Sequence, residues 1–79
     1  MMDAYDEGTV VWDDPQHPPY VDVYCPIAGW KARMMVWVRY SFGGYYEPWE
    51  TGCFAYATQA EAIHAARSWA DAEEIECKV

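Results

Sequence analysis

The stretch from Trp30 to Phe42, W-K-A-R-M-M-V-W-V-R-Y-S-F, constrains the fold of this chain more than any other. Its even positions are all apolar, whereas its odd positions include the three cations Lys31, Arg33 and Arg39. A period of two places successive side chains on opposite faces of a strand, and the β-branched and aromatic content fits a half-buried surface. A helical period would scatter the cations around the helix. The stretch therefore predicts the central strand of a β-sheet.

Two weaker strand patterns precede it. Residues 9–12 (T-V-V-W) predict a short strand, and residues 20–25 alternate so that their odd positions would face the core. Between them, residues 13–19 (D-D-P-Q-H-P-P) contain three prolines, which remove backbone donors. We expect this segment to be a loop.

After the central strand, Gly43-Gly44 predicts a tight hairpin turn. Residues 45–50 would return as the next strand, in which Pro48 marks an edge or a bulge. Residues 53–56 would continue that strand.

A helix is predicted from Gln59 to about Ala72. Thr58, followed three residues later by Glu61, is the pattern of a capping box, and alanine supplies six helical positions. We expect Val36 and Val38 of the central strand to lie under this helix. The alternation of residues 75–79 predicts a short last strand.

Together these elements predict one α+β domain over residues 1–79, with residues 1–8 mobile at its start. The expected architecture is an antiparallel sheet of three to four strands with one helix packed on one face. The opposite face would present aromatic and cationic side chains.

The formal net charge of −8 is concentrated at the two ends of the chain. Residues 1–24 hold six acidic and no basic residues, and residues 71–79 hold four acidic residues and one lysine. Such a balance opposes direct binding to nucleic acid or to an anionic membrane and favours basic partners. The alternative is that this negative surface charge serves only to keep the protein soluble.

Few residues point to catalysis or metal binding. Cys25, Cys53 and Cys77 form no CxxC pair, so we expect reduced thiols that face the core of a cytoplasmic protein. With His17 and His64 they make no recognisable zinc set, although a Cys-His nucleophile pair stays open. The sequence therefore predicts a protein that is not an enzyme and needs no cofactor or metal.

Carboxylates that line a strand can imitate nucleic acid. Glu74 and Glu76, if on one strand, would lie about 6.6 Å apart on the same face. A row with such spacing could replace phosphates in a basic groove and release the same counterions.

The predicted meander, followed by T-Q-A-E-A-I-H-A-A-R-S-W-A from Thr58 to Ala70, is similar in layout to phage-encoded anti-CRISPR proteins, including those that act on type I effector complexes. The resemblance covers the whole chain in size, charge and element order and assigns no role to a single residue. It implies an inhibitor that acts in the cytoplasm of an infected bacterial host cell. It also implies binding to a basic site on a CRISPR effector, where DNA or guide RNA would otherwise sit.

The leading hypothesis is therefore a monomeric, non-enzymatic inhibitor that acts by acidic nucleic-acid mimicry. The alternative is a homodimeric structural or assembly module that uses the aromatic sheet face, and a small hydrolase or metal protein ranks third. The residues expected to bind the partner are the acidic residues Asp13, Asp14, Glu47, Glu50, Glu73, Glu74 and Glu76.

Overall fold

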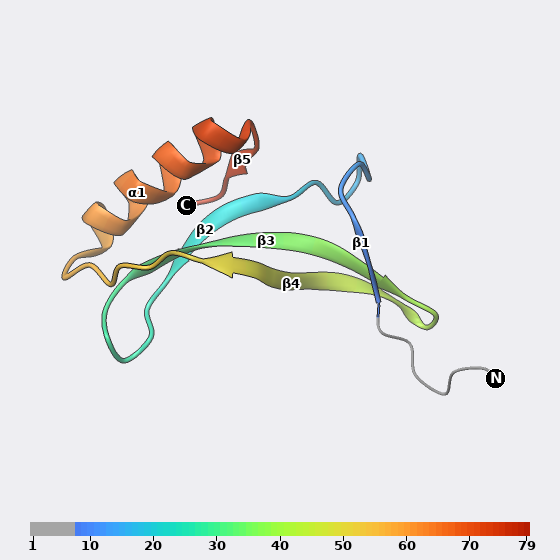
Figure 1. Cartoon of the computed structure of the whole chain (residues 1–79), viewed down its shortest axis with the longest axis horizontal. Coiled ribbons are helices and arrows are strands. Elements are labelled where there is room, and N and C mark those ends of the chain that lie inside the picture. Colours follow the sequence, from blue (N-terminus) through green and yellow to red (C-terminus); the bar gives the residue numbers. More distant parts are fainter. Residues whose placement is uncertain (1–7) are drawn as a thin grey trace.

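Strand β3 (Lys31–Tyr40) lies at the centre of the sheet, as the alternation predicts. The computed structural model describes residues 8–79, so the expected mobility of residues 1–8 falls outside it except at Gly8. One edge of β3 pairs antiparallel with β4 (Gly43–Thr51). The other edge is shared by β2 (Tyr20–Tyr24) and β1 (Thr9–Val11), which both run antiparallel to β3 (Figure 1).

The fifth strand makes the sheet mixed. Strand β5 (Glu76–Cys77) pairs parallel with β2, opposite Tyr20 and Val21. The prediction of three to four antiparallel strands with one helix is right in class, but it missed this parallel pair. The direction follows from the connection, because helix α1 (Gln59–Glu73) carries the chain back along the sheet after β4. The fold is α+β, with one helix on a mostly antiparallel sheet.

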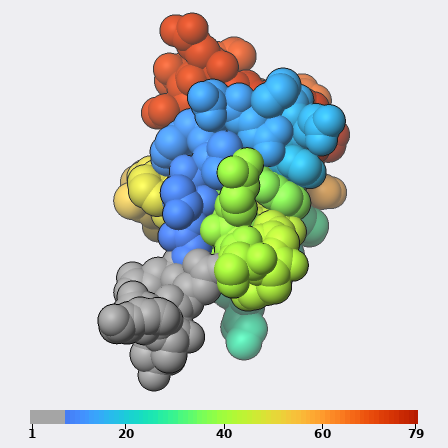
Figure 2. All heavy atoms as spheres, turned by 90° about the vertical axis from the view of Figure 1, so that its right-hand side faces the viewer, coloured from blue at the N-terminus to red at the C-terminus, as the bar shows by residue number. Residues whose placement is uncertain are grey.

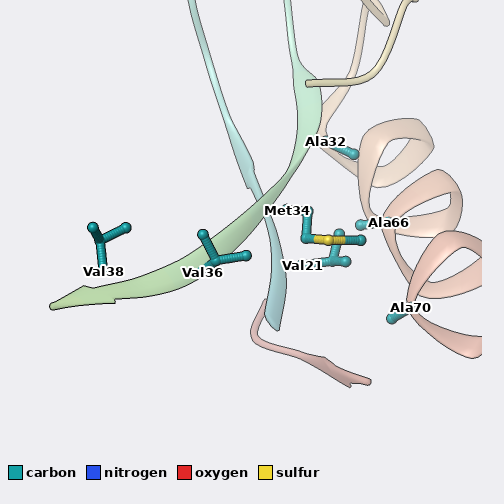
Figure 3. Close-up of a cluster of buried hydrophobic side chains, with 7 residues drawn as sticks. All are labelled: Val21, Ala32, Met34, Val36, Val38, Ala66 and Ala70. Atoms are coloured by element: carbon teal, nitrogen blue, oxygen red, sulfur yellow. The ribbon is translucent and has the colours of Figure 1, made fainter. Parts of the chain in front are cut away.

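Helix α1 packs through a stripe of buried alanines, Ala62, Ala66 and Ala70. Their small side chains let the helix approach β2 and β3, where Val21, Ala32 and Met34 complete the core (Figure 3). All three strand residues point to the same face, which confirms the predicted inward positions.

The prediction that Val36 and Val38 lie under the helix is wrong. Figure 3 shows both side chains on the core face but farther along β3, away from the helix. The cause is the connection before the helix, which is held at the opposite end of β3. There the backbone N–H of Gly52 donates to the carbonyl of Ala32 at 2.8 Å, and Trp30 and Tyr56 form an antiparallel bridge.

The two ends of the helix differ in how well their residues suit the capping motif that each end forms. At the N-terminus, the Thr58 hydroxyl accepts from the Glu61 N–H while the Glu61 carboxylate accepts from the Thr58 N–H, each at 3.2 Å, so the predicted capping box is confirmed. At the C-terminus, Glu74 adopts a left-handed conformation with φ 60°. The N–H of Glu74 donates to Asp71 and that of Ile75 to Ala70, which is the Schellman pattern that usually uses glycine.

The hairpin is confirmed, but its turn lies two residues earlier than predicted. Tyr40 pairs with Gly43, so Ser41 and Phe42 form the turn. Neither has a positive φ, and the positive φ falls instead on Gly43 at 140°. Gly44 is a strand residue, where a Cβ atom would come within 2.7 Å of the Trp37 ring.

For the rest of β4, the prediction for Pro48 is confirmed and the prediction for residues 53–56 is wrong. Pro48 lies on an edge strand and beside a β-bulge, because the register shifts between Met34 and Met35. Residues 53–56 do not continue the strand, apart from the single bridge at Tyr56.

The three thiols do not all face the core. Cys77 is half-buried against it, but Cys25 and Cys53 are exposed, so the prediction for these two is wrong. Strand β2 ends at Tyr24, before its alternation reaches Cys25, and Cys53 lies in a bend after β4. No helix in residues 8–79 is long and apolar enough to cross a membrane.

Candidate functional site

The loop of residues 13–19 folds back over the outer face of the sheet, which we define as the face opposite the helix. The His17 ring stacks on Trp37, with centroids 3.6 Å apart and planes 10° from parallel. The Tyr46 hydroxyl donates to the Pro18 carbonyl at 2.8 Å. This part of the N-terminal segment therefore covers the aromatic centre of the outer face.

The Asp14 side chain contacts two other residues of the same loop. Its carboxylate accepts from the backbone N–H of Gln16 at 2.9 Å and lies 3.2 Å from Nδ1 of His17. These contacts, the Gln16 hydrogen bond first, lower the pKa of Asp14 below its ordinary value of 3.8. Asp14 thus keeps its negative charge while it positions the loop.

Two cations, Arg33 and Lys78, are engaged by neighbouring side chains. Arg33 Nε lies 2.8 Å from Oδ1 of Asp22, and the guanidinium carbon lies 4.8 Å from the centroid of the Tyr24 ring. Lys78 Nζ lies 4.6 Å from the centroid of the Tyr20 ring. With Trp37 covered and these two cations engaged, the outer face is a poor platform for single-stranded nucleic acid.

The C-terminal end of the helix and the loop of residues 13–19 are connected through the pairing of β2 with β5. The loop leads into β2 at Tyr20, and Tyr20 pairs with Glu76 of β5, which follows the helix. In Figure 2 the blue loop lies below the red end of the helix, whereas Figure 1 shows the two segments separated along the long axis of the molecule. We call six acidic residues of the loop, the helix end and β5 the acidic edge: Asp13, Asp14, Asp71, Glu73, Glu74 and Glu76.

The acidic edge has few close ion pairs. Within residues 8–79, Asp14 alone of these six lies within ion-pair distance of a basic side chain, and its partner is His17. The last turn of the helix holds no basic residue, and Lys78 points to Tyr20 and Tyr46 instead. The negative end of the helix dipole adds to the same field.

This arrangement corrects the predicted row of phosphate-like carboxylates. Glu74 is not a strand residue but the helix cap, so only Glu76 lies on β5. The 6.6 Å spacing derived from a shared strand therefore does not apply. The negative surface comes from a helix end, a two-residue strand and a loop.

Two of the predicted residues lie elsewhere. Glu47 and Glu50 are on β4, the edge strand on the far side of β3. Glu47 is half-buried and accepts a hydrogen bond from the Tyr40 hydroxyl, which raises the pKa of Tyr40. Five of the seven predicted residues thus belong to the loop of residues 13–19, the helix end and β5, and these two belong to β4.

Asp71 is the residue that sequence reasoning missed. It lies in the last helical turn and is exposed. The signal was present in the sequence, because residues 71–76 contain four acidic residues and no cation at the end of a predicted helix.

Other candidate sites are weaker. Among the described residues no three histidine, cysteine, aspartate or glutamate side chains converge as metal ligands. A depression beside the helix N-terminus is lined by Tyr56, Ala60, Glu61, His64 and Ala65, but Glu61 is already used in the capping box.

Comparison with protein-family models, with curated proteins and with solved structures finds no match to this chain.

Proposed function

We propose that this protein is a non-enzymatic inhibitor whose acidic edge docks on a basic surface of another protein, in the place of nucleic-acid phosphates. The observation that carries the proposal is the C-terminal end of helix α1. Asp71, Glu73 and Glu74 lie there together, and the last turn holds no cation.

This helix end is unfavourable for stability in two ways. Acidic residues near the negative end of a helix dipole each cost about 0.3–1 kcal/mol at low salt. A residue with a Cβ atom in the left-handed region, such as Glu74, costs about 1–2 kcal/mol. The other end of the same helix follows the rules for capping. Departures from local rules are concentrated at functional sites, so we infer that these carboxylates serve binding.

A basic partner would gain from this surface in the way it gains from DNA. Carboxylates without internal ion pairs can bind lysine and arginine side chains and release the counterions that both surfaces hold. The net charge of −8 opposes direct contact with nucleic acid itself.

The proposed partner is a basic nucleic-acid-binding subunit of a CRISPR effector, met in the cytoplasm of an infected bacterial cell. The resemblance of the sequence to anti-CRISPR proteins motivates this choice, and the acidic edge is compatible with it. A homodimer through the outer face is the weaker alternative, because the loop of residues 13–19 already covers Trp37.

The test is a pull-down from cells that carry a type I CRISPR effector, followed by affinity measurements against ionic strength. We expect Glu73→Gln, Glu74→Gln and Glu76→Gln together to weaken binding at least tenfold and to flatten its salt dependence, since a lost ion pair at a partly desolvated interface costs about 1–3 kcal/mol.

The matched control removes three charges from Asp3, Asp6 and Glu7, where we expect a smaller effect. DNA should compete with the wild-type protein for its partner. Binding that is insensitive to salt, or a ternary complex in which DNA and the protein bind the partner together, would rule out mimicry.

A further inference from the structure

A second exposed surface lies on the helix side of the sheet. Among the described elements, helix α1 contacts only β2, β3 and β5, so the face over β1 and β4 has no helix above it. Val36 is nevertheless only 1% exposed there. Val10 of β1 and Tyr40 of β3 pack against the core cluster that contains Val36.

Trp12 and Trp49 form an exposed aromatic pair between the end of β1 and the bulge of β4. Their ring centroids are 5.1 Å apart and their planes are nearly perpendicular, at 85°. Val11, the last residue of β1, pairs with Trp37 of β3, and Trp12 follows it directly in the chain. Trp49 comes from the bulge of β4, and the two rings thus meet across β3. They remain 48% and 54% exposed.

Carboxylates surround the two tryptophans. Glu47 pairs with Val36 and Glu50 with Met34, which places both on this face of β4. Asp13 directly follows Trp12 in the chain. The cations of β3 occupy its odd positions and therefore face the other side of the sheet. We call Trp12, Trp49 and Glu50 the tryptophan corner.

The geometry points to the tryptophan corner as a receptor for an arginine side chain of the protein partner. A planar guanidinium can stack on one indole, meet the edge of the other and pair with a carboxylate. Glu50 is the exposed carboxylate for that pair, because Glu47 already accepts from Tyr40. A second copy of this chain would bring the same acidic residues face to face and is disfavoured.

This inference rests on the proposed function for the basic nature of the partner and adds an anchoring residue to it. Trp12 and Asp13 are consecutive, so the tryptophan corner adjoins the acidic edge. One basic partner surface could contact both. The acidic edge would then provide long-range attraction, and the tryptophan corner would select arginine over lysine.

The test uses the intact protein and follows the indole N–H resonances of its five tryptophans by NMR. The probes are a hexa-arginine amide and a hexa-lysine amide of equal charge. We expect hexa-arginine to shift the resonances of Trp12 and Trp49 and hexa-lysine to shift them much less. Glu50→Gln should weaken the hexa-arginine effect about two- to fivefold.

The matched control is Asp3→Asn, which removes one charge from a residue that belongs to neither the tryptophan corner nor the acidic edge and should leave the titration of the two indoles unchanged. Trp49→Phe tests the stacking itself with little change in packing. Equal shifts with both peptides, or no shift at Trp12 and Trp49, would overturn the arginine receptor. These outcomes are independent of the salt and DNA competition measurements that test the acidic edge.

Discussion

Replacing Glu74 with glycine should make this protein more stable and, at the same time, a weaker binder. Glu74 ends helix α1 with φ 60°, a conformation that glycine adopts without steric conflict. Its carboxylate also lies at the negative end of the helix dipole. The change therefore removes two unfavourable features of the folded state.

The expected gain can be worked out from the parts. Release of the left-handed strain raises the free energy of unfolding by about 1–2 kcal/mol. The larger chain entropy of glycine in the unfolded state lowers it by about 0.5–1 kcal/mol. Removal of the charge adds about 0.3–1 kcal/mol at low salt. The sum is a gain of about 1–2 kcal/mol in the free energy of unfolding. For a domain of this size, each 1 kcal/mol raises Tm by about 4–8 °C.

Thermal unfolding followed by circular dichroism, at low salt and at about 1 M salt, separates the two contributions. Glu74→Gln is the matched variant, because it removes the charge but keeps the Cβ atom. Its gain should disappear at high salt, where the Debye length falls to about 3 Å. The additional gain of Glu74→Gly should persist there.

Two results would refute this reasoning. A Glu74→Gly variant less stable than the wild type would show that residue 74 is not left-handed. A Glu74→Gln variant with unchanged stability at low salt would show that its charge carries no local cost, which removes the observation on which the proposed function rests. Both variants should also lose affinity for a basic partner.

Two further predictions concern the thiols and the response to acid. Thiol reagents should label Cys25 and Cys53 quickly and Cys77 slowly, because burial raises the pKa of Cys77; uniform labelling in the native protein would contradict the core-facing position of Cys77. The pKa of Asp14 is lower in the folded than in the unfolded state, so its stabilising effect is complete well above pH 3.8 and is lost as the pH falls through the folded pKa. As the pH falls, the free energy of unfolding should therefore decrease less steeply in Asp14→Asn than in the wild type. An equal decrease in the two proteins would exclude this role.

Much of the fold follows from local patterns in the sequence. The alternation around β3 identified the core face, and Thr58 with Glu61 identified the start of the helix. Such patterns are readable because a period of two or a capping box depends on residues that are neighbours in the chain. The acidic character of the end of the helix is local in the same sense.

Contacts between distant segments could not be read in this way. The exposure of Cys25 and the turn at Ser41-Phe42 depend on where pairing stops, and pairing is decided by the partner strand. The stacking of His17 on Trp37 joins a proline-rich loop to a strand twenty residues later, and no local period encodes it.

The sequence alone determined that the chain is acidic, that its charge gathers at its two ends and that a strand of alternating character organises the sheet. Only the tertiary structure decided which carboxylates share a surface. The parallel pairing of β5 with β2 brings Glu76 opposite Tyr20, where the loop of Asp13 and Asp14 ends, while β4 carries Glu47 and Glu50 on the other side of β3. The physical reason is that charge belongs to individual residues, whereas an electrostatic surface depends on how the strands pair.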